Sequence, residues 1–259
     1  MSTLEAPTAP SASSFAASVT DAVKVYGKGD TAVRALDGVD LQLPRGGFTA
    51  VMGPSGSGKS TLMHCMAGLD RLTSGQATIG DASLETLKDA ALTKLRRRKV
   101  GFIFQAFNLV QTLTARENIE LPLRLDGAKP DGAWFEQVVT RLGIADRLDH
   151  TPTELSGGQI QRVAVARALV SRPDVIFADE PTGNLDQASG AEVLALMRAA
   201  VDDYGQTIVM VTHDPNSASI ADRVLFLFDG RLVDSIDRPT ADSVFEKLRA
   251  LSQGTGEAR

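Results

Sequence analysis

Four short apolar runs set the pattern of hydrophobic and polar positions along this chain. They cover residues 48–52, 100–104, 175–178 and 207–212, and each is rich in valine, isoleucine, phenylalanine or methionine. Runs of this length without alternation are typical of strands buried on both faces of a parallel sheet. Longer stretches with helical character lie between them. The pattern therefore predicts an α/β fold with a mostly parallel central sheet.

Different patterns flank these runs. Residues 21–26 and 32–43 predict antiparallel strands around a turn at 27–30, and residues 75–80 predict another short strand. Helices are expected at residues 61–67, 86–98, 160–170, 187–203 and 241–251. Residues 112–147 are helical and rich in loops, with Pro122, Pro130 and Gly143 as breaks, and predict a helical subdomain over about 106–170. Residues 222–228 and 230–236 predict a closing hairpin.

Composition and charge exclude several classes of protein. The 259 residues are 43% hydrophobic and 23% charged, which suits one soluble α/β domain with a subdomain. A net charge of -5 argues against a general nucleic-acid binder, and we assign the basic run at 96–99 to a solvated helix end. One cysteine rules out an internal disulfide framework, and no apolar run approaches the roughly 18 residues that span a membrane. Residues 1–18, rich in alanine, serine, threonine and proline, predict a disordered tail, with the folded domain over 19–240 and a terminal helix and tail over 241–259.

A phosphate-binding motif follows the first apolar run. Residues 53–60 match the pattern of Gly, four residues, Gly, Lys and Ser, between a predicted strand and a predicted helix. Glycines let the backbone curl so that successive amides point at one anion beside a helix N-terminus. Lys59 would reach the β and γ phosphates and the Ser60 hydroxyl would hold Mg²⁺. The nucleotide-binding residues predicted here are Gly53, Pro54, Ser55, Gly56, Ser57, Gly58, Lys59, Ser60 and Thr61.

Polar residues stand at the ends of the other apolar runs. Gln105 follows one run, Asp179 and Glu180 end the next, and His213 follows the last. Because ligands bind at the carboxyl ends of parallel strands, we expect these side chains near the phosphate loop. Paired acids in that place suit a metal ligand followed by a base that activates water.

Two further features have an alternative structural explanation. Residues 155–159, Leu-Ser-Gly-Gly-Gln, open a predicted helix with Ser156 as N-cap, and the bare backbone of Gly157 and Gly158, with Gln159 beside it, offers another anion site. Ser-Gly-Gly alone is also a common helix start. Tyr26 ends the first predicted strand, where its ring could stack on an adenine or pack on a sheet edge.

Together these motifs resemble those of an ABC-type ATPase, which has a P-loop NTPase core with an N-terminal antiparallel β-subdomain and an α-helical subdomain. Residues 53–61, Gln105, 155–159, 175–180, 183–186 and His213 correspond to the Walker A, Q-loop, signature, Walker B, D-loop and H-loop segments, in the family's order. The resemblance covers residues 19–236. Residues 104–109 and 113–122 are similar to the lipoprotein-release, macrolide-export and peptide-export subgroup. Residues 150–154 lack the acidic-Gly-Glu-Arg-Gly element of larger exporter families.

The resemblance implies a function and a mechanism. ATP would stack on Tyr26, Mg²⁺ would be held by Ser60, Gln105 and Asp179, Glu180 would polarise the attacking water and His213 would contact the γ-phosphate. Residues 156–159 would meet the ATP of a second copy, so the working unit would be a head-to-tail dimer with two ATPs. We expect the ATP-hydrolysing subunit of an ABC transporter, at the inner face of the cell membrane through a separate permease, with no nucleic-acid partner.

One alternative of a different class stays open. A non-transport member of the family would use ATP-driven dimerisation to regulate a membrane or macromolecular partner mechanically. Members that work on DNA or ribosomes usually carry two cassettes or a long coiled-coil insertion, and this chain has neither, which favours the transporter. A P-loop kinase or GTPase does not explain residues 155–159. The chain also lacks the Asn-Lys-x-Asp element that reads the base.

Overall fold

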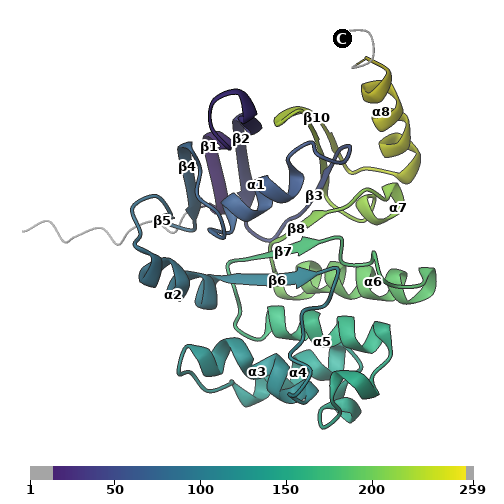
Figure 1. Ribbon diagram of the computed structural model, residues 1–259. Coiled ribbons are helices and arrows are strands. Elements are labelled where there is room, and N and C mark those ends of the chain that lie inside the picture. Colours follow the sequence, from purple (N-terminus) through teal and green to yellow (C-terminus); the bar gives the residue numbers. More distant parts are fainter. Residues whose placement is uncertain (1–13, 255–259) are drawn as a thin grey trace, which may run out of the picture.

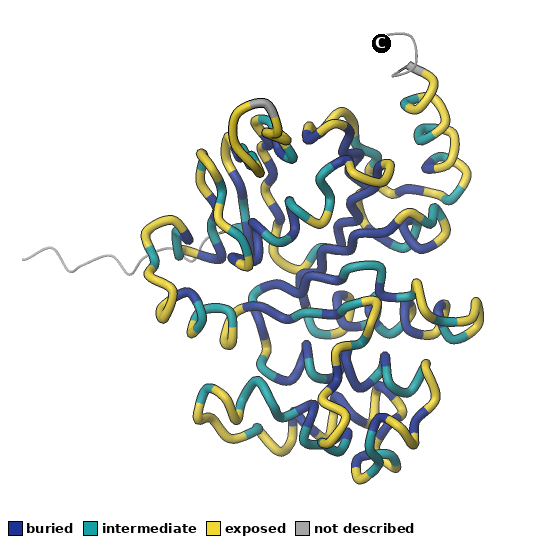
Figure 2. The backbone as a smooth tube through the Cα atoms, viewed as in Figure 1, coloured by how far each residue is buried: buried dark blue, intermediate teal, exposed yellow. Residues whose placement is uncertain are grey.

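A six-stranded sheet forms the centre of the computed structural model, which describes residues 14–254 (Figure 1). Its strand order is β10-β9-β3-β8-β7-β6, and all neighbours are parallel except β9 and β10. The strands are β3 (Phe48–Met52), β6 (Val100–Phe104), β7 (Val175–Asp179), β8 (Ile208–Val211), β9 (Arg223–Phe228) and β10 (Arg231–Asp237). The apolar runs thus form the buried parallel sheet, as predicted, and Figure 2 shows these strands as a largely buried band.

The register of the parallel strands brings their carboxyl ends to one edge. Phe104 pairs with Asp179, Asp179 with Val211, and Val211 with Val51. The segments that follow these four strands therefore leave the sheet side by side. This register confirms that the predicted polar residues share one edge of the sheet.

A second, antiparallel sheet has the order β2-β1-β4-β5. Its strands are β1 (Phe15–Tyr26), β2 (Val33–Pro44), β4 (Ser74–Ile79) and β5 (Ala82–Ser83). Strand β1 starts earlier than predicted, so the assignment of residues 15–18 to a disordered tail is wrong. The strand lies between β2 and β4, where Ala16, Ala17 and Val19 are buried. The segment resembles a tail in composition, but its small side chains pack closely there. The rest of the predicted tail, residues 1–13, lies outside the described residues.

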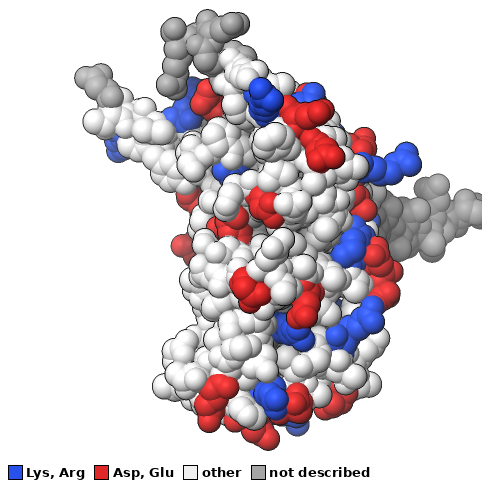
Figure 3. All heavy atoms as spheres, turned by 90° about the vertical axis from the view of Figure 1, so that its right-hand side faces the viewer, with Lys and Arg blue, Asp and Glu red and all other residues white. Residues whose placement is uncertain are grey.

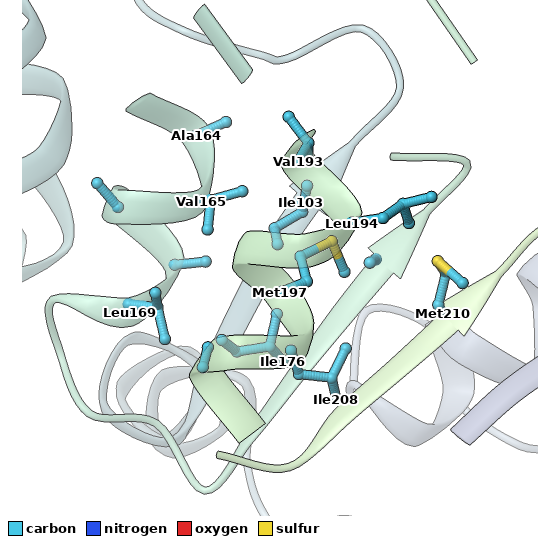
Figure 4. Close-up of a cluster of buried hydrophobic side chains, with 14 of the residues drawn as sticks. Ile103, Ala164, Val165, Leu169, Ile176, Val193, Leu194, Met197, Ile208 and Met210 are labelled. Carbon is cyan, nitrogen blue, oxygen red and sulfur yellow. The ribbon is translucent and has the colours of Figure 1, made fainter. Parts of the chain in front are cut away.

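Helices cover both faces of the central sheet. Helix α1 (Lys59–Met66) packs between the two sheets, and α5 (Gly157–Leu169) and α6 (Gln187–Tyr204) pack on the opposite face. Figure 4 shows this second contact, where Val165 and Leu169 of α5 and Val193 and Met197 of α6 meet strand residues such as Ile176. Two cores thus fix α1 and α5, the helices that carry the predicted anion sites at their N-termini.

The helical subdomain consists of α3 (Ala115–Leu125) and α4 (Gly132–Arg141) around α5. Pro122 lies inside α3 and does not end it, so the expectation of a break there is wrong. The only tryptophan of the chain, Trp134 on α4, packs edge-on against Tyr204 of α6, with ring centroids 5.0 Å apart, and its indole N–H donates to the Leu169 carbonyl. These contacts join the subdomain to the core.

The remaining helices lie at the periphery. They are α2 (Asp89–Lys99), α7 (Pro215–Ala218) and α8 (Ala241–Gly254), with 3₁₀ turns at Gly29–Thr31, Ala145–Arg147 and Pro152–Glu154. On the face that carries α6 to α8, basic and acidic side chains are interspersed (Figure 3). Within residues 14–254, no helix combines the length and apolar character needed to cross a lipid bilayer.

Candidate nucleotide-binding site

The loop between β3 and α1 has the geometry of an anion cradle. Gly53, Gly56 and Gly58 adopt positive φ values of 154°, 80° and 102°. A Cβ atom on Gly53 would lie 2.0 Å from the Leu227 carbonyl oxygen, and one on Gly58 would lie 2.3 Å from that of Ala35, so only glycine fits there. Gly58 is also the N-cap of α1 and makes no side-chain cap, which leaves the first amides of that helix for an anion.

Lys59 lies over this loop. Its Nζ atom is 2.9 Å from the Gly53 carbonyl oxygen and 2.8 Å from that of Pro54. Burial lowers the pKa of Lys59, while the nearby carboxylates of Glu180 and Asp179 raise it. The ammonium group therefore sits between the loop and the two acids, where negative charge of a ligand would be stabilised.

Asp179 and Glu180 differ in environment although they are adjacent. Burial raises the pKa of Asp179, and His64 and Lys59 oppose that rise. Glu180 adopts a left-handed backbone with φ of 46°, and its amide donates to the Val211 carbonyl over 2.9 Å. The strand thus ends at Asp179, and the turned backbone points the next carboxylate in a different direction.

The Glu180 carboxylate meets His213, which follows β8. The two side chains are joined by a contact of 2.9 Å between Nδ1 of His213 and Oε1 of Glu180. The His213 side chain is 76% exposed, so the pair lies at the protein surface. Both residues line a groove of about 840 Å³ that continues along α6 to Arg198.

Gln105 lies at the same sheet edge, but its hydrogen bonds are to Asn184. Its Nε2 atom donates to Oδ1 of Asn184 over 3.3 Å, and Nδ2 of Asn184 donates to the Gln105 carbonyl over 2.9 Å. No hydrogen bond joins Gln105 to Asp179 or Ser60 among residues 14–254. The Q-loop position is thus tied to residues 183–186, a contact that the sequence did not reveal because Asn184 is 79 positions away.

Tyr26 stands next to the phosphate loop. Its hydroxyl donates to Oδ2 of Asp70 over 2.7 Å, and the Lys24 ammonium lies 4.7 Å from the ring centroid. Burial and the Asp70 carboxylate raise the pKa of Tyr26, and the side chain of Thr61 lowers it. Tyr26 is 42% exposed, so it is available to a ligand beside α1. Lys24 and Asp70 are partners that sequence reasoning missed.

Residues 155–159 form the predicted helix start. Ser156 caps α5 by accepting from the Gln159 amide over 3.3 Å, and the Gln159 side chain accepts from the Ser156 amide over 2.9 Å. Around the bare backbone, a Cβ on Gly157 would lie 3.5 Å from Leu185, and one on Gly158 3.3 Å from Ser189. In the part of the chain that the structure describes, no hydrogen bond links residues 155–159 to the loop at 53–61.

Comparisons with known proteins agree with this geometry. The family model described as ABC transporter matches residues 36–183. The macrolide export ATP-binding/permease protein MacB of Marinobacter nauticus is 45% identical over 216 residues, which are 83% of this chain and 33% of MacB. The chain thus spans about a third of that relative. An uncharacterized ABC transporter ATP-binding protein of Bacillus subtilis, YvcR, is 45% identical over 84% of this chain and 85% of its own.

A solved structure shows the same fold. It is the dimeric post-hydrolysis state of the ATP-binding cassette MJ0796 of Methanocaldococcus jannaschii, bound to ADP and Pi. It superposes with a TM-score of 0.77 at 38% identity and covers 86% of this chain and 98% of its own. The chain therefore belongs to the ABC transporter family, as an ATP-binding cassette with the P-loop NTPase fold.

Proposed function

We propose that this chain hydrolyses MgATP as a head-to-tail dimer and drives a separate membrane permease. The observation that carries the proposal is the register of β3, β6, β7 and β8, which brings the phosphate loop, Gln105, the two acids and His213 to one edge of the sheet. This arrangement provides a binding loop, oxygen ligands and a carboxylate base at one place.

The donor set fits Mg²⁺. That ion takes oxygen ligands, usually one or two carboxylates together with phosphate oxygens and water, and it supplies charge neutralisation for phosphoryl transfer when bound. The Asp179 carboxylate, the Ser60 hydroxyl and the Gln105 amide oxygen provide such atoms near the loop. The site thus suits a magnesium ion whose coordination the phosphate oxygens of a nucleotide would complete.

Each protein group of the site has its own role in this proposal. The amides at the start of α1 and the Lys59 ammonium bind the phosphates, and Tyr26 stacks on the base with the ring face that Lys24 does not cover. Glu180 accepts a proton from the attacking water, and its contact with His213 holds the carboxylate in place. His213, exposed beside it, is placed to touch the γ-phosphate.

A second copy completes each site in this proposal. The start of α5 lies close to Leu185 and Ser189 and, among the described residues, makes no hydrogen bond to the loop of its own chain. The amides of Gly157 and Gly158 are therefore offered outward, to a nucleotide on another copy. The dimeric state of the MJ0796 cassette supports this assembly.

The permease would dock where the Q-loop leaves the core, over residues 107–125. A groove of about 270 Å³ lies there, lined by apolar side chains such as Phe104 and Leu125 and by Arg96, Arg97 and Arg167. All three guanidinium groups donate to backbone carbonyls, and none forms an ion pair with a described carboxylate. Burial lowers the pKa of Arg167 to about 10. An acidic, amphipathic segment of the permease fits this surface, and it would hold the cassette at the inner face of the membrane.

The decisive test measures phosphate release by the purified full chain with ATP and Mg²⁺. We expect turnover that requires Mg²⁺ and is lost in Glu180→Gln. A parental chain that binds MgATP yet releases no phosphate, alone or with its permease, would contradict the proposal.

A further inference from the structure

Gln161 is a buried amide that packing alone does not explain. It lies in the second turn of α5 and its side chain is fully buried. Its Nε2 atom donates to the Pro181 carbonyl, whereas Oε1 has no hydrogen-bond partner among the described residues. A buried acceptor without a partner costs about 1–3 kcal/mol. An apolar side chain of similar size would avoid that cost, so the donated hydrogen bond is the feature of interest.

That bond acts on the backbone next to Glu180. Left-handed φ values are uncommon for residues other than glycine, and a following proline restricts the preceding residue further. Glu180, with φ of 46° before Pro181, therefore needs support from its surroundings. Strand β8 holds its amide through Val211, and its carbonyl accepts from the Gly183 amide over 3.0 Å. Gln161 holds the next carbonyl, the third fixed point of this turn.

The outward-facing amides lie one turn before Gln161, at the start of the same helix. Helix α5 begins after Ser156, and its first turn rests against Leu185 and Ser189. From there to Gln161 the helix is continuous, so a shift of its N-terminus moves the Gln161 side chain with it. The turn at Glu180 and Pro181 is thereby connected to the helix that faces a second copy.

We infer that Gln161 is a positioning residue, which sets the Glu180 carboxylate from helix α5 of the same chain. The inference rests on the proposed role of Glu180. It adds that the rate of turnover depends on the position of helix α5. A nucleotide of the second copy that binds at the start of this α5 would then align Glu180 of the same chain as α5, through the Gln161 amide.

The test compares Gln161→Met with the parental chain in steady-state hydrolysis of MgATP. Methionine has similar volume but no donor, so we expect kcat to fall about 3- to 10-fold, the effect of one neutral hydrogen bond. The KM for ATP should stay unchanged, since the phosphate loop and Tyr26 are not touched. The thermal midpoint should change little, since the substitution removes the unpaired Oε1 acceptor but takes the donor from the Pro181 carbonyl.

Gln206→Met is the matched control. Gln206 is also a buried glutamine whose Nε2 donates to a proline carbonyl, that of Pro173, but it lies at the opposite end of the sheet from Glu180. We expect its kcat to remain within twofold of the parental value. An equal loss in both variants would reduce Gln161 to a general structural role.

A double-mutant cycle with Glu180→Gln separates the possible outcomes. If Gln161 acts through the carboxylate, Gln161→Met should have little further effect in the Glu180→Gln background. A full kcat in folded Gln161→Met, or the same fold-loss in both backgrounds, overturns the inference while leaving the proposed function intact. Unchanged turnover in Glu180→Gln alone overturns the proposed function instead. If Gln161→Met melts below the assay temperature, Gln161→Leu takes its place in the cycle.

Discussion

The imidazole Nδ1 atom of His213 lies 2.9 Å from the Oε1 atom of Glu180, although the two residues are 33 positions apart. The contact joins the ends of β7 and β8 above the sheet. It leaves the second carboxylate oxygen of Glu180 for water. A change at Glu180 should therefore affect chemistry and leave binding intact.

Glu180→Gln should keep ATP binding and lose hydrolysis by about 10²- to 10⁴-fold, because the amide has the same shape without the basicity. Lys59, Ser60 and Asp179 are unchanged, so the uncleaved γ-phosphate should hold two copies together. Size exclusion with MgATP should show a shift from monomer to dimer that ADP does not produce. Parental turnover in this variant would remove the assignment of Glu180.

The same dimer tests the shared site. Adding Ser156→Arg to Glu180→Gln should keep the chain monomeric, because a bulky cation at the start of α5 obstructs a neighbouring copy. Ser156→Ala in that background is the control, since it adds no bulky cation and removes the hydroxyl that caps the helix, a cap worth about 1 kcal/mol. A dimer that survives Ser156→Arg would argue against contact through this helix end.

Lys59→Ala should abolish nucleotide binding at concentrations that saturate the parental chain. The substitution removes the one ammonium group that bridges the carbonyls of the phosphate loop and would offset the charge of the phosphates. Titration with a fluorescent ATP analogue measures it. Lys99→Ala, which loses only an ion pair with Asp174, should bind normally. Undiminished affinity in Lys59→Ala would rule out the loop as the phosphate site.

Leu125→Glu should uncouple the permease and leave basal hydrolysis unchanged. Leu125 is 56% exposed and lines the arginine-bearing groove. A carboxylate there would pair with the arginine side chains and repel an acidic segment of the permease. Co-purification with the permease and transport-coupled hydrolysis measure the effect. Val233→Glu on β10, 46% exposed and outside the groove, is the control. Equal co-purification of both variants would place the permease elsewhere.

The stability contributed by the Asp70 carboxylate, which accepts a hydrogen bond from Tyr26, should decrease in acid. Burial would raise the pKa of Asp70, but hydrogen bonds from Lys24 and Tyr26 outweigh it, and the pKa lies below its usual 3.8. A carboxyl with a lowered pKa in the folded state contributes stability above its unfolded pKa, and that contribution is lost as the pH falls through the folded value. Asp70→Asn should thus have a lower urea midpoint than the parental chain at pH 7, and the difference should shrink toward pH 3. Asp89→Asn, at a carboxylate 94% exposed, is the control for the same substitution on the surface.

Sequence patterns predicted the parts of the site that depend on the order of elements. The apolar runs located β3, β6, β7 and β8, and the rule that ligands bind at the carboxyl ends of parallel strands placed Gln105, Asp179, Glu180 and His213 together. The glycine pattern located the loop, since positive φ at Gly58 and its approach to Ala35 demand that residue.

The patterns failed where long-range contacts decide. Residues 15–18 look like a tail, but neighbours on β2 and β4 turn them into a strand. Pro122 looks like a helix break, yet packing of α3 against α5 carries the helix past it. The partners of the site residues, such as Asn184 for Gln105 and Asp70 for Tyr26, lie 44 to 79 positions away and follow no periodicity. Such pairs come from the fold, and a single sequence does not reveal them.

Trp134 has a use that follows from its place between subdomain and core. Its ring packs against Tyr204, at the end of α6, while the Arg172 guanidinium lies 4.8 Å from the ring centroid. Since it is the only indole of the chain, all tryptophan emission comes from this one contact. Any rotation of α4 relative to α6 changes the surroundings of that ring. The unlabelled protein therefore carries its own optical reporter of subdomain movement, readable in a stopped-flow fluorimeter as nucleotide is mixed in.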